Sequence, residues 1–226
     1  MSIFSISDLH LSFSADKPMD IFRGWENHEE KIKNNWCRIV KETDTVILPG
    51  DLSWGLKIEE TKADFAFLNN LPGKKILLKG NHDLWWGTAK KMREFLAENN
   101  FSKIDFVFNN CIVAENFAVC GTRGWFFDGG EDKKVLLREA GRLEMSIKEA
   151  LKTGLEPLVF LHYPPVFGGQ VCEEIFSVLK KYDIKKVYYG HVHGAGKAGI
   201  VNEYDGIMLK LVSCDSIDFT PFCIKY

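Results

Sequence analysis

The stretch KKILLKGNHD at residues 74–83 joins an apolar run of β type, Lys75–Lys79, to a glycine that is followed by three polar side chains. Other apolar runs end in the same way, in the segments Asp8-Leu9-His10, Gly50-Asp51, His162 and Gly190-His191-Val192-His193. In open α/β sheets, ligands bind just beyond the carboxyl ends of the strands. Because the pattern recurs at five strand ends, we expect these segments to meet at one edge of an α/β fold.

The order of the remaining elements indicates two sheets. The first half of the chain alternates β-type runs with stretches of helical spacing, which predicts parallel strands joined by crossover helices. Consecutive strands are expected from Asp105 to Cys120, with a tight turn at Asn109-Asn110, and a surface loop is expected at Phe126–Lys134. A mixed pair of β-sheets with helices outside fits this order better than a single doubly wound sheet.

The elements themselves follow from periodicity. The runs of β type are Ile3–Ser7, Thr45–Leu48, Lys75–Lys79, Asp105–Phe108, Cys111–Ala114, Phe117–Cys120, Leu158–Leu161, Lys186–Tyr189, Ile207–Ser213 and Phe222–Tyr226. Apolar residues recur with a helical period within Ile32–Val40, Ala89–Leu96, Leu136–Leu151 and Val171–Tyr182. No internal repeat or linker separates these elements, so residues 1–226 are expected to form a single domain.

Composition limits the classes of function. The chain has 226 residues, 46% of them hydrophobic, which is enough for one sizeable core. A formal net charge of -2 argues against a general affinity for nucleic acid or for anionic membranes. The six cysteines form no CxxC pair, and no apolar run approaches the roughly 20 residues of a membrane-spanning helix. With no recognisable leader, we expect a cytoplasmic protein with free thiols.

The residue types at the strand ends suit metal ions. Carboxylate and amide oxygens, together with imidazole nitrogens, are what a pair of catalytic divalent metals requires. The one-residue gap in Asp8/His10 and in His191/His193 is expected to place both members of each pair on the same face of extended backbone. Taken alone, Asp8 could be a turn former and Asn81 a helix cap. Such roles do not explain five coincident strand ends.

Read in chain order, the segments spell D-x-H, G-D, G-N-H-D, H and G-H-x-H. This order resembles the signature of the calcineurin-like metallophosphoesterase family, and the motifs span residues 8–193. The resemblance implies a four-layer αββα sandwich in which two mixed β-sheets are flanked by helices, and a hydrolase of phosphoester bonds. It points to the bacterial phosphodiesterase branch, because the second motif, GDLSWG at residues 50–55, lacks the arginine usual in protein serine/threonine phosphatases.

The resemblance also implies roles for individual residues. Two divalent metal ions are expected, either manganese, iron or zinc, and the sequence does not rank these metals. They would hold a hydroxide between them for attack on phosphorus. His82 would act as a catalytic donor to the leaving-group or phosphoryl oxygen, and Asp83 would orient it. The expected ligands are Asp8, His10 and His193 for the first metal, Asn81, His162 and His191 for the second, and Asp51 as the bridge.

Aromatic and basic residues near these segments suggest substrate contacts. Trp54, Trp85 and Tyr163 could pack against a nucleobase or another aryl group, and the guanidinium of Arg123 could bind a phosphate. The alternative for each ring is packing of its own loop, and for the arginine a place on the surface. A small phosphoester substrate is therefore expected, nucleotides included, with nucleic acid left open as a substrate and no membrane partner. The sixth histidine, His28, fits a structural role in the first turn of a helix.

The sequence thus predicts a dinuclear-metal phosphoesterase that acts on phosphodiesters. Two alternatives remain, namely a phosphomonoesterase or nucleotidase, and a non-catalytic scaffold of the same fold such as the retromer subunit that resembles it. Loss of the histidine of the third motif would favour the scaffold, whereas His82 is present here. The oligomeric state is not indicated by the sequence.

Overall fold

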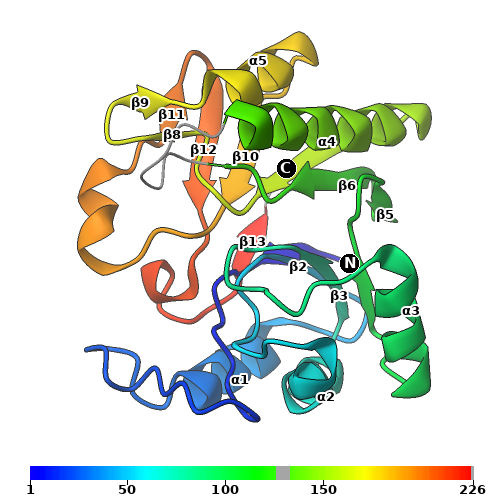
Figure 1. Cartoon of the computed structure of the whole chain (residues 1–226), viewed down its shortest axis with the longest axis vertical. Coiled ribbons are helices and arrows are strands. Elements are labelled where there is room, and N and C mark those ends of the chain that lie inside the picture. Colours follow the sequence, from blue (N-terminus) through cyan, green and yellow to red (C-terminus); the bar gives the residue numbers. More distant parts are fainter. Residues whose placement is uncertain (126–132, 225–226) are drawn as a thin grey trace.

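Two large mixed β-sheets lie face to face in the computed structural model, which describes residues 1–125 and 133–224 (Figure 1). Helices cover the outer face of each sheet. The expectation of a four-layer αββα sandwich is therefore confirmed. Among the described residues, no helix has both the length and the apolar character needed to cross a lipid bilayer.

The first sheet has five strands, and four of them run parallel. Its order is β13 (Phe222–Ile224), β1 (Ile3–Ser5), β2 (Thr45–Pro49), β3 (Lys74–Leu78) and β4 (Ile104–Phe106), with β13 antiparallel to β1. The helices beside it are α1 (His28–Ile39), α2 (Lys62–Asn70) and α3 (Ala89–Glu98). Trp36, Phe65 and Met92 of these helices are buried in one cluster with the outer face of the sheet.

The second sheet has six strands and antiparallel pairing at both edges. Its order is β11 (Glu203–Tyr204), β12 (Ile207–Leu211), β10 (Lys186–Tyr189), β7 (Glu156–Leu161), β6 (Phe117–Thr122) and β5 (Ile112–Ala114). Two helices, α4 (Lys133–Lys152) and α5 (Glu173–Lys181), cover its outer face. Two kinds of short element complete the fold. One is a hairpin of β8 (Val166–Phe167) and β9 (Gln170–Val171). The others are three 3-10 turns, namely η1 (Ile58–Thr61), η2 (Gly194–Gly199) and η3 (Cys214–Ser216).

The two sheets are held together by a buried layer of aliphatic and aromatic side chains. Ile47 and Ile76 of the first sheet pack in one cluster with Val119 and Phe160 of the second. Their strand neighbours point the other way, as Val46 does toward the α1 side, because successive side chains of a strand alternate between its faces. Strands buried on both faces are apolar throughout, which explains why these runs were recognisable in the sequence.

Three features of the chain differ from expectation. Asn109-Asn110 is not the turn of a hairpin, because β4 before it lies in the first sheet and β5 after it lies in the second. The tight turn follows β5 instead, at Glu115, whose φ is 52°. Helix α2 and the short strands β8, β9 and β11 were not expected. Of the expected loop Phe126–Lys134, residues 126–132 lie outside the described part of the chain, and Lys133-Lys134 begin α4.

Candidate metal centre

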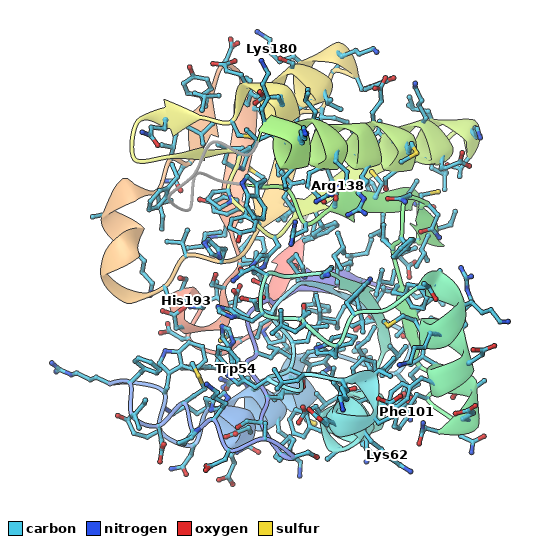
Figure 2. All side chains as sticks on the ribbon, in the orientation of Figure 1. Trp54, Lys62, Phe101, Arg138, Lys180 and His193 are labelled. Carbon is cyan, nitrogen blue, oxygen red and sulfur yellow. The ribbon has the colours of Figure 1, made fainter. Side chains whose placement is uncertain are left out.

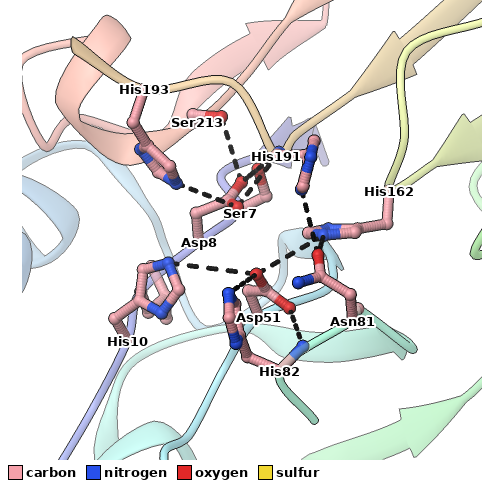
Figure 3. Close-up of polar contacts among 12 residues, drawn as sticks. Ser7, Asp8, His10, Asp51, Asn81, His82, His162, His191, His193 and Ser213 are labelled. Atoms are coloured by element: carbon pink, nitrogen blue, oxygen red, sulfur yellow. Dashed lines mark hydrogen bonds and ion pairs between the residues drawn. The ribbon is translucent and has the colours of Figure 1, made fainter. Parts of the chain in front are cut away.

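Five strand ends from the two sheets converge on one site (Figure 3). Asp8, Asp51 and Asn81 follow β1, β2 and β3 of the first sheet. His162 and His191 follow β7 and β10 of the second sheet. The carboxyl ends of parallel strands meet at the same edge of a sheet, and here the two edges face each other. The expected convergence of these segments is thus present.

The ligand loops turn sharply rather than continuing as strands. Asp8, His10, Asp51 and His191 have φ angles of 59°, 46°, 54° and 70°, in the left-handed region. Aspartate and histidine are among the non-glycine residues that tolerate this region best. The expectation that extended backbone places Asp8 and His10 on one face is therefore wrong, because two left-handed residues bend the chain between β1 and Leu11.

One group of ligand atoms comes from Asp8, His10 and His193. Their side-chain oxygen and nitrogen atoms all lie within 4.8 Å of one another, as a single cation would require. Nε2 of His193 is 3.2 Å from Oδ1 of Asp8. Asp8 is fully buried and its carboxylate also accepts hydrogen bonds from the hydroxyl groups of Ser7 and Ser213. A mixed oxygen and nitrogen set of this kind fits a divalent transition metal.

A second group consists of Asp51, His162 and His191, whose ligand atoms also lie within 4.8 Å of one another. Asn81 joins this group through Oδ1, which is 2.6 Å from Nε2 of His162 and 3.0 Å from Nδ1 of His191. The other ring nitrogen of His162 is 3.0 Å from the carbonyl oxygen of Pro49. Since that carbonyl can only accept, Nδ1 carries the proton of the neutral ring, and Nε2 would be the atom that binds a metal.

Asp51 lies between the two groups. Its Oδ2 atom is 3.4 Å from Nε2 of His162 in the second group and 4.0 Å from Nε2 of His10 in the first. The same oxygen is 4.0 Å from Nε2 of His82 (Figure 3). A carboxylate in this position faces both groups at once, which is the place expected for a bridging ligand.

The buried charges perturb one another strongly. Burial would raise the pKa of Asp8, but the positive charge and hydrogen bond of His193 hold it well below its usual range. Burial would lower the pKa of His162 and of His193, but Asp51 raises the first to about 9 and Asp8 raises the second to about 10. Burial lowers the pKa of His10 to about 4. Without metal, two imidazolium groups therefore neutralise the two buried carboxylates at pH 7.

His82 is the exposed member of the constellation. Its side chain is 45% exposed, whereas those of Asp51 and His162 are 2% and 0% exposed. The backbone N–H of His82 donates to Oδ1 of Asp51 at 2.8 Å, which anchors the residue beside the candidate bridge. The imidazole is thus free to meet a molecule that approaches the centre from solvent.

Asp83 has a different environment from the one expected. Its buried carboxylate accepts hydrogen bonds from the backbone N–H groups of Asp51, Leu52 and Gly80 at 2.9, 2.9 and 2.7 Å. No contact joins it to the imidazole of His82 within the described part of the chain. Asp83 therefore fastens the loop after β2 to the loop after β3, and its carboxylate is not the orienting partner of His82. Burial, and then the charge of Asp51, raises the pKa of Asp83 to about 6.

Two glycines allow the ligand loops to pack this closely. A Cβ atom added at Gly80 would collide with the carboxylate and the backbone nitrogen of Asp51. A Cβ atom at Gly190 would collide with the carboxylate of Asp8 and the hydroxyl of Ser7. Neither glycine has a positive φ, so the requirement is for space rather than for backbone freedom.

Asp215 is a site residue that was not anticipated. Its Oδ1 accepts a hydrogen bond from Nδ1 of His193 at 2.8 Å, and its Oδ2 is 3.1 Å from Nζ of Lys197. Such a carboxylate fixes the orientation of a metal-binding imidazole. The sequence held a signal, because the segment Ser213-Cys214-Asp215 follows an apolar run just as the other ligand segments do. That run becomes β12, the neighbour of β10.

A cavity of about 650 Å³ opens beside His10, His82 and His193. Trp54 lines it and stacks on the ring of His10, with ring centroids 4.9 Å apart. Figure 2 shows Trp54 and His193 on the same side of the molecule, where the loops of the two sheets meet. Phe22, Arg23, Trp25 and Lys197 supply further aromatic and basic lining. This cavity is where a substrate would reach the candidate metal centre.

The other expected substrate contacts lie elsewhere. Trp85 is 3% exposed and packs edge-on against Phe65 in the core, so it does not reach this cavity. Tyr163 is also buried, with its ring 4.3 Å from the ring of His191. Arg123 lines a separate cavity and is 3.7 Å from Glu139.

His28 has the structural role expected of it. It is 2% exposed at the start of α1, and its Nε2 is 3.1 Å from the carbonyl oxygen of Leu9. Because Leu9 lies between Asp8 and His10, this contact stabilises the turn that carries both residues. His28 is therefore a support for the ligand loop and not a member of either ligand group.

Comparison with known proteins agrees with this geometry. A "probable cyclic nucleotide phosphodiesterase" of Ruthia magnifica subsp. Calyptogena magnifica is 25% identical over 227 residues, covering 95% of this chain and 85% of the relative. A protein of the same description from Vesicomyosocius okutanii subsp. Calyptogena okutanii is 24% identical, with the same coverage. The crystal structure of a protein of unknown function from Aquifex aeolicus shares the fold, with a TM-score of 0.52 and 18% identity over 98% of this chain and 95% of that one.

The family model of the calcineurin-like phosphoesterases matches residues 1–195, which include all the ligand segments. That match covers both ligand groups and His82, and it supports an enzyme rather than a scaffold. The chain belongs to the calcineurin-like phosphoesterase family and is a metal-dependent hydrolase of phosphoesters.

Proposed function

We propose that this protein is a phosphodiesterase with two metal ions, in which Asp51 bridges them. The observation that carries the proposal is the position of Oδ2 of Asp51 between His162 of one ligand group and His10 of the other. Asp8 and His193 would complete the first site with His10, and the second would take Asn81, His162 and His191. Manganese, iron and zinc all suit a set of carboxylate, amide and imidazole ligands.

The protein's own groups would hold the substrate for in-line displacement. When bound, the two metals would supply Lewis-acid stabilisation of the phosphoryl oxygens and a water of lowered pKa as the nucleophile. His82, exposed beside Asp51, would donate a hydrogen bond to the leaving-group oxygen. The hydrogen bond from the backbone N–H of His82 to Oδ1 of Asp51 would hold the imidazole beside the metal centre. Trp54, which stacks on His10 and packs at a tilt against His82, would limit the movement of both rings.

The cavity supports an aryl-bearing diester as the substrate class. A phosphodiester carries two organic substituents, and the aromatic walls at Phe22, Trp25 and Trp54 offer one of them an apolar surface. Arg23 and Lys197 also line the cavity, and because Lys197 is paired with Asp215, Arg23 is the cation that would meet an anionic ester. Nucleotides combine a nucleobase with such a charge, and the names of the two relatives point in the same direction.

Hydrolysis of paired substrates tests this proposal. Protein loaded separately with manganese, iron or zinc would be assayed on bis(4-nitrophenyl) phosphate, 4-nitrophenyl phosphate and cyclic nucleotides. We expect kcat/KM for the diesters to exceed that for the monoester by at least about tenfold. A preference for the monoester would instead identify a phosphomonoesterase.

Substitution of the bridge tests the metal centre itself. Asp51→Asn should remove most bound metal and activity, because an amide cannot supply a bridging negative charge. The matched control is Asp20→Asn, at an exposed aspartate outside the centre. Metal content would be counted by mass spectrometry of the intact protein. A full complement of two metals in the Asp51 variant, with normal turnover, would contradict the proposal.

A further inference from the structure

A second, smaller cavity of about 220 Å³ lies between the ends of β3, β4 and β6 and the helix α4. Its lining combines apolar residues with charged and polar ones, and Lys79, Thr122, Arg123, Glu139 and Arg142 are among the latter. Within the described residues, none that lines this cavity also lines the cavity beside the metal centre. It is therefore a separate place at which a ligand could bind.

The cavity carries more positive than negative charge. Three cationic side chains, Lys79, Arg123 and Arg142, face one carboxylate, Glu139, whose side chain is 0% exposed. Both oxygens of Glu139 are already used. Oε1 accepts from Nη1 of Arg142 at 2.8 Å, and Oε2 accepts from the hydroxyl of Thr122 at 2.7 Å. One carboxylate cannot neutralise three cations, so the cavity keeps a formal charge of +2 among these groups.

Arg123 contacts Glu139 and Trp125, but its guanidinium is incompletely hydrogen-bonded. Its Nη2 is 3.7 Å from Oε1 of Glu139, and its guanidinium lies 4.9 Å from the ring centre of Trp125. Its Nε–H is buried and has no hydrogen-bond partner within the described part of the chain. A buried donor without an acceptor is uncommon in folded proteins, because the missing hydrogen bond costs free energy. A bound ligand could supply the missing acceptor. A guanidinium that is not fully hydrogen-bonded within the protein is well suited to an oxyanion.

We propose that this cavity binds a phosphate dianion, held by Arg123, Arg142 and Lys79. A tetrahedral oxyanion of charge -2 matches the excess charge, and it supplies several acceptor oxygens for the guanidinium groups. The cavity has room for a phosphate and a small substituent but is a third of the size of the cavity beside the metal centre. The dianion could arrive as free phosphate or as a second phosphoryl group of a molecule bound at the metal centre.

Titration with inorganic phosphate, followed by NMR, tests the site. The probe would be added to ¹⁵N-labelled, zinc-loaded protein, because zinc is diamagnetic. The backbone amides of Gly87, Gly121 and Thr122, which line the cavity, should shift saturably. Arg142→Gln and Arg123→Gln should each raise the dissociation constant read from these amides by at least about tenfold. Arg138→Gln is the matched control, since Arg138 is exposed one turn earlier on α4 and does not line the cavity.

Two results would overturn the proposal. One is the absence of saturable shifts at these amides in the unaltered protein. The other is a dissociation constant that stays within about twofold of the unaltered protein in both Arg123→Gln and Arg142→Gln. Arg142→Lys guards against loss of the fold, because it keeps a cation beside Glu139 and should still bind phosphate. The spectrum away from the cavity shows whether each variant is folded.

A second probe identifies the source of the dianion. Adenosine 3′,5′-bisphosphate carries two phosphoryl groups on one molecule. If the cavity takes a second phosphoryl group of a molecule at the metal centre, the amides of Thr122 and of Gly194, beside the larger cavity, should titrate with one shared dissociation constant. Two independent constants would identify free phosphate or a separate phosphorylated effector. Because binding alone is measured, the outcome does not depend on turnover.

Discussion

Nδ1 of His193 donates a hydrogen bond to Oδ1 of Asp215 at 2.8 Å, and Nε2 of the same ring faces Oδ1 of Asp8 at 3.2 Å. One imidazole therefore joins two carboxylates from opposite ends of the chain. The bond to Asp215 fixes which nitrogen carries the proton and leaves Nε2 available to a metal. Asp215 is itself held by the backbone N–H of Gly194 and by Lys197, so the ring has little freedom to rotate.

Replacing Asp215 should weaken metal binding without unfolding the protein. Asp215→Asn keeps the shape of the side chain but removes the charge that stabilises the imidazole. We expect the affinity for the metal at the group of Asp8, His10 and His193 to fall by roughly 10–100-fold, as is usual when the orienting partner of a metal ligand is lost. Competition with a metal indicator measures the affinity. Asp218→Asn is the control, because Asp218 lines the same cavity but has no bond to His193. Equal affinities in both variants would contradict the role.

Removing the imidazole of His82 should separate chemistry from metal binding. The ring is exposed and 4.0 Å from Asp51, and it belongs to neither ligand group. His82→Ala should therefore keep the full metal content while kcat falls by roughly 10²–10⁴-fold, the usual contribution of a proton donor. Metal analysis and steady-state kinetics on the same preparation measure both quantities. Two bound metals with unchanged turnover would show that His82 has no part in the reaction.

The pattern of apolar runs followed by polar residues predicted much of this architecture, because burial of a strand restricts which residues it can contain. A strand that is buried on both faces has to be apolar, as Val46 and Ile47 of β2 are, and its polar residues are displaced to the loop that follows. The stretch 74–83 shows the same boundary, and the structure ends β3 at Leu78, one residue before the expected end. The positions of the strand ends, and the types of the polar residues that follow them, can therefore be read from the sequence before the fold is known.

What escaped prediction depends on tertiary contacts. The place of Asp215 after an apolar run is visible in the sequence, but its importance is set by its bond to His193, which is a tertiary contact. The family resemblance implied that the carboxylate of Asp83 orients His82, yet its partners are the N–H groups of Asp51 and Leu52 in another loop. Helix α2 was missed because only a few apolar residues of this short helix face the core.

Metal affinity should increase with pH across the neutral range. Asp51 raises the pKa of His162 to about 9, and Asp8 raises that of His193 to about 10, so both imidazoles are protonated at pH 7 in the absence of metal. A metal ion needs the neutral ring and has to displace these protons. A raised pKa means that protons compete below that pKa and cease to compete above it, so affinity rises until pH reaches about 9–10.

Calorimetry in buffers of different ionisation enthalpy measures this linkage. At pH 7 we expect His162 and His193 to release about two protons as the two sites fill. His10 should contribute none, because burial lowers its pKa to about 4 and it is already neutral. Binding without proton release, at an affinity that stays constant from about pH 6 to pH 9, would contradict the electrostatic description of the centre.

The close packing of the ligand loops makes a steric prediction at Gly80. An added methyl group would collide with both the carboxylate and the backbone nitrogen of Asp51. Because the backbone is one of the colliding groups, a movement of side chains alone cannot relieve the clash. Gly80→Ala should therefore displace the candidate bridge, abolish binding of at least one metal, and lower the free energy of unfolding by about 1–3 kcal/mol. Gly141→Ala is the matched control, because Gly141 lies within α4 and its Cβ would meet nothing within 4 Å. That variant should be neutral or up to about 1 kcal/mol more stable. Urea denaturation with metal analysis distinguishes the two, and normal metal content in Gly80→Ala would show that the loops are not in contact as described.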